Sequence, residues 1–257
     1  MRAACCEATV LSHEVIAADI RLLRALWPDR EHVPHAGQFF TLRAWGADEA
    51  PFLSRPISVH KWDAETQTVE FLYAVVGEGT RKLTALKKGD SFQLTGPMGN
   101  GFDVPDILSK YKKIAVVGGG IGTAPMYQVT RELAAAGVRP DVFFGFRDAP
   151  YCMEEYRSIA NLVKVSTDTG AVGFHGFVTQ LYDPADYDVV LVCGPTVMMR
   201  NAARLCAEKG TPCFVSLEKK MACGIGACLG CTCETKGGEG KSVCKNGPVF
   251  DATEVFF

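Results

Sequence analysis

Hydrophobic and polar positions alternate with a period of two through the first hundred residues, the pattern of strands with one buried face. Glycine, proline and aspartate separate the alternating segments. These segments lie at residues 7–11, 20–26, 38–44, 56–61, 68–76 and 91–95. Several short strands at this spacing predict a small antiparallel β-barrel, interrupted by one short helix at residues 79–86.

The middle of the chain changes to continuous apolar runs that alternate with helical patterns. The runs lie at residues 114–117, 142–146, 162–166 and 189–192, and the helical patterns at 125–136 and 197–209. Pro125 suits a first helical turn, and Gly137 and Gly210 suit helix ends. Strands that are buried on both faces and alternate with helices predict a doubly wound parallel sheet.

The last segment carries closely spaced cysteines and a glycine-rich hairpin at residues 236–240. It is too short to bury a core alone, so we expect a metal centre to organise it. The predicted fold class is therefore α/β plus β in three domains. They are a β-barrel domain at 1–103, a Rossmann-like domain at 104–212 and a small cluster-binding domain at 213–257.

Composition narrows the function classes. The 257 residues are 47% hydrophobic and 22% charged, which is ordinary for a globular protein. A net charge of −2 gives no basic field for nucleic acid. No apolar run approaches the roughly 20 residues that span a bilayer, and the N-terminus lacks the apolar region of a signal peptide. We expect neither nucleic acid nor membrane as a partner.

Eleven cysteines are unusually many for such a chain. Disulfide-rich secreted scaffolds are typically much shorter. Seven of the cysteines are scattered and mostly lie among apolar neighbours, as buried free thiols do. A reducing cytoplasm is the expected setting.

The remaining four cysteines form the most specific motif. Cys223, Cys228, Cys231 and Cys244 have the order C-x4-C-x2-C-x12-C. The first three match the plant-type spacing that holds a [2Fe–2S] cluster. A structural zinc site is the alternative, but zinc knuckles and ribbons usually space both pairs by two residues. Cys233 would point away from the site in an extended segment, and we interpret it as a packed or spare thiol.

Three glycines separate these cysteines. Gly224, Gly226 and Gly230 permit positive φ, so the backbone can curl around an inorganic core. Their N–H groups can also point at sulfur and tune the cluster potential. Cys244 would close the site from the following hairpin.

Arg55, Pro56, Ile57 and Ser58 have the chemistry of a flavin site. The arginine offers a fixed fork of donors to phosphate oxygens, and the serine offers a hydroxyl to a flavin ring nitrogen. An isolated Arg-Pro pair is more often surface structure, so the surrounding pattern has to support the interpretation.

Leu72, Tyr73 and Ala74 end another predicted strand, and Gly79 and Thr80 open the short helix. A helix start presents unpaired N–H groups to pyrophosphate, and Tyr73 is placed to lie along a ring system. The alternatives are a half-buried strand tyrosine and a turn glycine. A barrel followed by a strand–glycine–helix unit favours the flavin interpretation.

A glycine run follows the first buried strand of the middle domain. Gly118, Gly120, Gly122 and Thr123 lie in a loop that opens a helix, where a dinucleotide phosphate would bind. The run is not a regular G-x-G-x-x-G, and no acidic residue occupies the ribose position about 20 residues further on.

Cys193 follows a later strand of the same sheet, in Cys193-Gly-Pro. Ligands of open α/β sheets bind at the carboxyl ends of strands, so Cys193 is placed to face a nicotinamide ring. A buried thiol packed beneath the turn is an equally good interpretation.

Two further segments have more than one interpretation. Residues 96–102 form a seam between barrel and sheet that either borders the flavin or is only a rigid linker. The Glu218–Lys220 run is placed to meet a partner, but a solvated charged face is the more common explanation.

Together these motifs resemble the ferredoxin–NADP reductase superfamily. They resemble more closely its branch that serves as the electron transfer subunit of dihydroorotate dehydrogenase B. The likeness covers nearly the whole chain and depends on the order of the motifs. Those motifs are Arg55-Pro-Ile-Ser, Gly79-Thr80, the loop at 118–125, Cys193-Gly-Pro and the four-cysteine tail.

The resemblance implies FAD held by the residues from Arg55 to Ser58, by Leu72 to Ala74, and by Gly79 with Thr80. It implies a [2Fe–2S] cluster on the four cysteines, with NAD as a diffusible acceptor. It also implies a separate FMN-containing subunit that oxidises dihydroorotate in pyrimidine (UMP) biosynthesis, with two of each subunit in a heterotetramer.

Three other functions share part of these features. A hydrogenase or sulfide-linked NAD(P)H reductase subunit would carry the same cofactors and differ in its partner. An iron–sulfur redox sensor would control a partner without catalysis, against which the flavin and nucleotide motifs argue. A zinc-stabilised binding module would be colourless.

Overall fold

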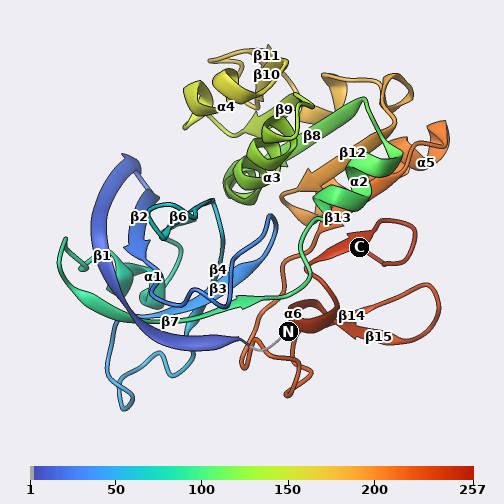
Figure 1. Cartoon of the computed structure of the whole chain (residues 1–257). Coiled ribbons are helices and arrows are strands. Elements are labelled where there is room, and N and C mark those ends of the chain that lie inside the picture. The colour runs from blue at the N-terminus through green and yellow to red at the C-terminus, as the bar shows by residue number, and fades with distance from the viewer. Residues whose placement is uncertain (1–2) are drawn as a thin grey trace.

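The first part of the chain forms a strongly curved antiparallel sheet. The computed structural model describes residues 3–257, and Figure 1 shows the sheet in blue and teal, beside the rest of the chain. Its strands are β1 (Ala4–Ala17), β2 (Ile20–Leu26), β3 (Phe39–Arg43), β4 (Arg55–Ser58), β5 (Lys61–Asp63), β6 (Thr68–Ala74) and β7 (Ser91–Met98). Their order is β4-β3-β7-β1-β2-β6-β5, which agrees with the predicted antiparallel barrel.

The chain itself crosses between the two edges of this sheet. The predicted strand at 56–61 is divided into β4, which pairs with β3, and β5, which pairs with β6. Between them, the N–H of Val59 donates to Gln38 and the N–H of His60 donates to Glu70. The two residues thus change partner strands, which explains the break. The short helix α1 (Glu78–Leu83) follows β6.

The middle part is the predicted parallel sheet with helices on both faces. Its strands are β8 (Ile114–Gly119), β9 (Asp141–Phe146), β10 (Leu162–Thr167), β11 (Phe174–His175), β12 (Val189–Cys193), β13 (Cys213–Ser216) and β16 (Val249–Asp251). The order is β11-β10-β9-β8-β12-β13-β16, and only β16 runs antiparallel. The long helices are α3 (Thr123–Ala135) and α5 (Thr196–Lys209).

Both long helices stop where the sequence indicates. Gly137 and Gly210 have φ of +85° and +71°, the left-handed conformation that glycine adopts at little cost. Two shorter helices were not anticipated. They are α2 (Val104–Lys110) and α4 (Met153–Ile159), and each has seven residues, too few for a clear periodic pattern.

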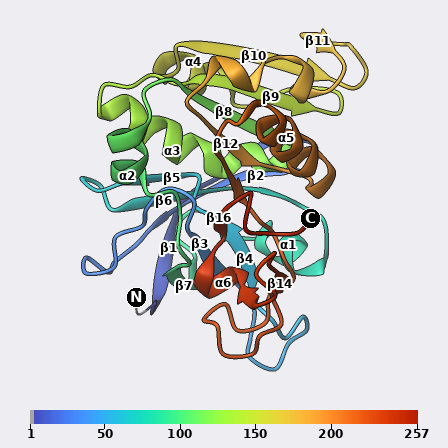
Figure 2. The ribbon, with the colours of Figure 1, turned by 90° about the vertical axis from the view of Figure 1, so that its right-hand side faces the viewer.

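The C-terminal segment lies below the parallel sheet and against the barrel, in red in Figures 1 and 2. It contains β14 (Thr232–Glu234), β15 (Gly240–Ser242) and the one-turn helix α6 (Val243–Asn246). Cys231 and Cys244 belong to the same apolar cluster as Val192 and Val215 of the sheet. The segment therefore shares its core with the nucleotide domain, and β13, with which the predicted cluster domain would begin, pairs with β12 of the parallel sheet. The division at residue 213 stays a prediction.

Residues 96–102 join all three parts. Asn100 donates from Nδ2 to the carbonyls of Lys245 (3.1 Å) and Asn246 (3.3 Å), at the end of α6. Its backbone also pairs with Gly247 and Val249. This seam is thus a clamp on the cluster segment. Within residues 3–257, no helix is long and apolar enough to cross a membrane.

Candidate functional site

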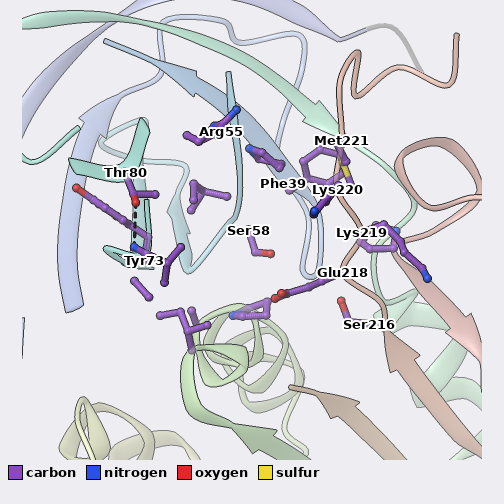
Figure 3. A pocket seen from close by; sticks show the side chains of 18 of the residues that line it. Phe39, Arg55, Ser58, Tyr73, Thr80, Ser216, Glu218, Lys219, Lys220 and Met221 are labelled. Carbon is purple, nitrogen blue, oxygen red and sulfur yellow. Dashed lines mark hydrogen bonds between the residues drawn. The ribbon is translucent and has the colours of Figure 1, made fainter. Parts of the chain in front are cut away.

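A cavity of about 590 Å³ lies where the barrel, the parallel sheet and the C-terminal segment meet (Figure 3). Its wall includes most of the predicted flavin residues. These are Arg55, Pro56, Ile57, Ser58, Leu72, Tyr73, Ala74 and Thr80. Residues far apart in the sequence are therefore brought to one hollow, and its volume is in the range of small-molecule cofactor sites.

Arg55 and Gly79, predicted separately, lie in direct contact. A Cβ at position 79 would come 2.6 Å from Cδ of Arg55, so only glycine lets the arginine lie across the start of α1. Arg55 donates from Nη2 to the carbonyl of Leu53 at 2.6 Å, while its buried Nε has no partner among the described residues. A buried donor without a partner is costly, which suits a site for a phosphate oxygen.

Thr80 fixes the turn that leads into α1. Its Oγ1 accepts from the N–H groups of Val76 (3.0 Å) and Gly77 (3.1 Å) and lies 3.0 Å from the carbonyl of Gly77, to which it donates. The hydroxyl is fully used by the turn. Ser58, by contrast, makes no hydrogen bond through its hydroxyl to the rest of residues 3–257, and its side chain lines the cavity.

The ring of Tyr73 lies inside the barrel. The residue is 1% exposed, and its hydroxyl is 3.0 Å from Nε2 of His13, whose Nδ1 is 3.0 Å from the carbonyl of Leu86. Burial raises the pKa of Tyr73. Tyr73 therefore links β6 to β1 across β2, and it is more deeply buried than the half-buried strand tyrosine of the alternative interpretation. His13 carried no signal in the sequence.

The glycine loop packs closely onto the neighbouring strand end. Gly120 has φ +55° with open space around it, whereas a Cβ at Gly122 would lie 2.5 Å from Cα of Gly194. Thr123 donates from Oγ1 to the carbonyl of Gly120 at 2.9 Å, and Gly118 packs against Phe144. Ile121, Ala124 and Pro125, from the same turn, line the cavity.

Cys193 lies beneath this turn and not on the cavity wall. It is 1% exposed and belongs to the core on one face of the sheet. Burial, followed by the nearby carboxylate of Glu218, raises the pKa of its thiol. This position is that of the packed thiol. A contact between Cys193 and a nicotinamide stays a prediction.

The four predicted cluster cysteines lie in one loop and the adjacent helix α6. The N–H groups of this loop point at their sulfurs: Gly226 at Cys244 (3.1 Å), Cys228 at Cys223 (3.4 Å), Gly230 at Cys228 (3.4 Å) and Cys244 at Cys231 (3.4 Å). Such donors stabilise thiolates and tune a bound cluster. Over residues 3–257, no three Cys, His, Asp or Glu side chains are grouped as ligands of a single ion.

The loop curls through residues with positive φ. Gly224 (+70°) and Gly226 (+80°) take this conformation as expected, but the third is Leu229 (+58°) and not Gly230. Gly230 contributes its N–H to sulfur instead. The prediction was therefore right about the curl and wrong about one of the residues that make it.

The cysteines differ in their electrostatic surroundings. Partial burial raises the pKa of Cys223, but backbone donors from Cys228, Ile225 and Ala227 outweigh it and bring the pKa down to about 6. Burial, followed by contact with Cys231, raises the pKa of Cys244 to about 12. Since a cluster binds thiolates, its binding would release protons.

Cys233 differs from these four. It is 3% exposed, and its thiol donates to the carbonyl of Lys241 at 3.3 Å, across the β14–β15 hairpin. Of the two interpretations that the sequence left open, its position is that of the packed thiol.

The cavity wall also contains residues that the flavin prediction did not include. They are Phe39, Leu53, Val76, Ser216, Leu217, Glu218, Lys219, Lys220, Met221 and Pro248, together with the three glycine-loop residues named above. The Glu218–Lys220 run is exposed, as expected of a charged face, but it borders the cavity. In the sequence, the only indication that this run belongs to a site was its position beside the cysteine loop.

The cavity and the cysteine loop are adjacent. Met221 lines the cavity, and Cys223 follows two residues later, at most about 7 Å along the chain. On the barrel side, Met98 pairs with Phe39, which lines the cavity. A Cβ at Gly224 would lie 3.0 Å from the sulfur of Met98. Two packed connections therefore join the two sites.

This architecture is that of a ferredoxin–NADP reductase-like protein with an added iron–sulfur segment. Residues 218–256 match the model of the iron-sulfur cluster binding domain of dihydroorotate dehydrogenase B. A solved structure described as an NADH-dependent reduced ferredoxin-NADP oxidoreductase superposes with a TM-score of 0.85 at 28% identity, covering 97% of this chain and 89% of that one.

Curated relatives narrow the class. The electron transfer subunit of dihydroorotate dehydrogenase B (NAD(+)) from Clostridium acetobutylicum is 47% identical over 85% of both chains. The subunit of that name from Caldanaerobacter subterraneus is 38% identical over 98% of both. The chain belongs to the family of dihydroorotate dehydrogenase B electron transfer subunits.

Proposed function

We propose that this chain passes electrons from a dihydroorotate-oxidising catalytic subunit to NAD⁺. The route is a [2Fe–2S] cluster on Cys223, Cys228, Cys231 and Cys244, followed by FAD in the cavity. A bound cluster would supply single-electron transfer, and a bound flavin would supply the exchange between single electrons and pairs. The chain supplies binding, orientation and separation from water.

The observation that carries this proposal is the junction between the two sites. Met221 on the cavity wall is followed two residues later by Cys223, and Met98 packs on the cysteine loop. An arrangement that only stored a metal would not require a cofactor-sized cavity at this junction.

Each cofactor has residues suited to hold it. The unpartnered Nε of Arg55 is suited to a phosphate oxygen of FAD, and the free hydroxyl of Ser58 to a flavin ring atom. The glycine loop and the start of α3 present N–H groups to NAD phosphates. A preference for NAD over NADP follows from the names of the relatives, not from an acidic residue in this loop.

The partner is proposed to be an FMN-containing subunit, with two copies of each subunit in the complex. The family name implies a catalytic partner. Ile225 and Leu229 are 60% and 65% exposed beside the exposed Cys228, which supports docking at the cluster loop. A cytoplasmic location is supported by eleven cysteines that form no disulfide.

The test begins with anaerobic purification together with the candidate catalytic subunit. Iron, acid-labile sulfide and FAD are measured first, followed by dihydroorotate-dependent reduction of NAD⁺. We expect stoichiometric cofactors and activity only in the complex. A fully loaded complex that lacks this activity would contradict the proposed partner and favour a hydrogenase-like or sulfide-linked reductase. Protein without iron or sulfide would contradict the cluster.

A further inference from the structure

One carboxyl group, that of Glu218, lines the flavin cavity. The other ionisable side chains on its wall are Arg55, Tyr73, Lys219 and Lys220. Glu218 comes two residues after the end of β13, between the nucleotide domain and the cysteine loop. Figure 3 shows its carboxylate pointing into the cavity, on the side where Ser58 lies.

This carboxylate has no partner. No hydrogen bond or ion pair joins Glu218 to another residue of the described chain, although Lys219 and Lys220 follow it directly. Its surface is accessible from the cavity, but the surrounding protein atoms limit its hydration, and this desolvation raises its pKa. No hydrogen bond or ion pair offsets this shift, although Arg55, Lys219 and Lys220 line the same cavity.

The groups around Glu218 come from several elements. Ser58 on β4 and Ser216 on β13 contribute hydroxyls to the cavity wall, and Arg55, Lys219 and Lys220 contribute positive charges to it. Cys193 on β12 lies beneath the wall, and the nearby carboxylate raises the pKa of its thiol further. A second negative charge entering this cavity would therefore meet a carboxylate that no hydrogen bond or ion pair holds.

We propose that Glu218 binds a proton when a flavin held in this cavity becomes negatively charged, and releases it when that charge leaves. The inference rests on the proposed function. Like charges in a poorly hydrated site disfavour each other, so the cheapest response is protonation of the carboxylate. The two groups then titrate as a coupled pair.

The step balances in protons and electrons. Two electrons from the cluster and one proton convert a neutral flavin into an anion, and the carboxylate of Glu218 binds a second proton from water. NAD⁺ then accepts two electrons and one proton, and Glu218 returns its proton to water. The net charge of the cavity stays the same in both states.

The test is the number of protons taken up with the electrons. The flavin midpoint potential of the anaerobic holoprotein is measured across the neutral pH range. In the window between the two pKa values of Glu218, the natural protein should take up two protons for two electrons. Glu218→Gln should take up one. Glu65→Gln removes an equal charge from an exposed turn and should behave like the natural protein.

An infrared difference spectrum gives a second readout. Reduced-minus-oxidised spectra of the natural protein should show a new band of a protonated carboxylic acid, which is absent in Glu218→Gln and kept in Glu65→Gln. An unchanged proton count in loaded Glu218→Gln, or no such band in the natural protein, would overturn the inference. If Glu218→Gln does not retain flavin, the spectrum of the natural protein decides.

Cofactor content separates the two levels of failure. Material without FAD or iron contradicts the proposed function itself. Fully loaded, active material with an unchanged proton count contradicts only the role of Glu218.

Discussion

The cysteine loop and the flavin cavity lie side by side but are built in opposite ways. The loop takes all of its sulfurs from one segment, and its own backbone N–H groups point at them. The cavity takes its wall from the barrel, the glycine loop and the C-terminal segment, and the side chains of Ser58 and Glu218 on that wall make no hydrogen bond to the described residues. Substitution of one cysteine should thus abolish cluster binding, whereas substitution of one residue on the cavity wall should only weaken cofactor binding.

The largest effect is expected from Cys228→Ser. Serine is a poor ligand for iron, so the cluster should be lost while flavin stays bound. The dihydroorotate-dependent reduction of NAD⁺ by the complex should fall by about 100-fold or more. Substitution of residues that only contact the ligands of a metal typically costs roughly 10–100-fold. Iron and sulfide analysis, electron paramagnetic resonance and the flavin spectrum measure this.

Cys233→Ser is the matched control for that variant. Its thiol bonds only to the carbonyl of Lys241, so the cluster should remain and stability should change by about 1 kcal/mol at most. A complete cluster in Cys228→Ser, or a missing one in Cys233→Ser, would show that the ligands are assigned wrongly.

A smaller effect is expected at the cavity from Gly79→Ala. The new methyl group would overlap the side chain of Arg55. Moving the arginine out of the way should cost about 1–3 kcal/mol. Flavin should bind about 5- to 140-fold more weakly, since each 1.4 kcal/mol is tenfold in Kd. Gly77→Ala is the control, because a Cβ there meets no atom within 4 Å and the backbone is extended. Equal flavin affinity in both variants would argue against the contact.

Asn100→Ala should separate the stability of the two sites. It removes two hydrogen bonds to the end of α6, each worth about 0.5–1.5 kcal/mol. On titration with urea, cluster absorbance should disappear before flavin is released. Asn161→Ala removes an exposed hydrogen bond to Asp141 on the far part of the sheet and should leave that order unchanged. Simultaneous loss in Asn100→Ala would indicate that the clamp does not hold the cluster segment.

The smallest effect concerns pH. Burial raises the pKa of Glu132, which accepts hydrogen bonds from Gln128 and from the N–H of Ala36 in the barrel. A carboxylic acid whose pKa is higher in the folded than in the unfolded protein binds its proton more tightly in the folded state. It therefore stabilises the fold at pH values below its ordinary pKa, and this stabilisation is lost as the pH rises through the pKa of the folded protein. Urea midpoints of the natural protein should therefore decline over that interval more than those of Glu132→Gln. If the urea midpoints of both proteins changed with pH in the same way, Glu132 would not be the cause of the decline.

Patterns in the sequence were enough where the determining contacts are local. Alternation predicted most of the barrel strands, and the glycines predicted the ends of α3 and α5, because each depends on neighbouring residues. The four cysteines could be grouped from their spacing alone. The division of β4 from β5 could not be predicted, because it depends on partner strands that are distant in sequence.

The candidate flavin site was found only in part for the same reason. Arg55, Ser58 and Gly79 were predicted from the sequence, but the contact between Arg55 and Gly79 depends on how β4 lies over α1. Tyr73 lines the cavity, so its place along a cofactor stays a prediction, but its partner His13 on β1 could not be foreseen. Glu218 looked like part of a solvated face, and only its place at a three-way junction makes it a cavity residue.

By itself the sequence determined the fold class of the barrel and of the parallel sheet, and it was enough to predict the four sulfur ligands. Periodicity, helix ends and ligand spacing are set within a few residues of one another, so they need no knowledge of the fold. The tertiary structure alone decided which side chains face the flavin cavity and how closely that cavity approaches the cysteine loop. Those features arise where three parts of the chain pack together, and packing between distant segments leaves no periodic trace in the sequence.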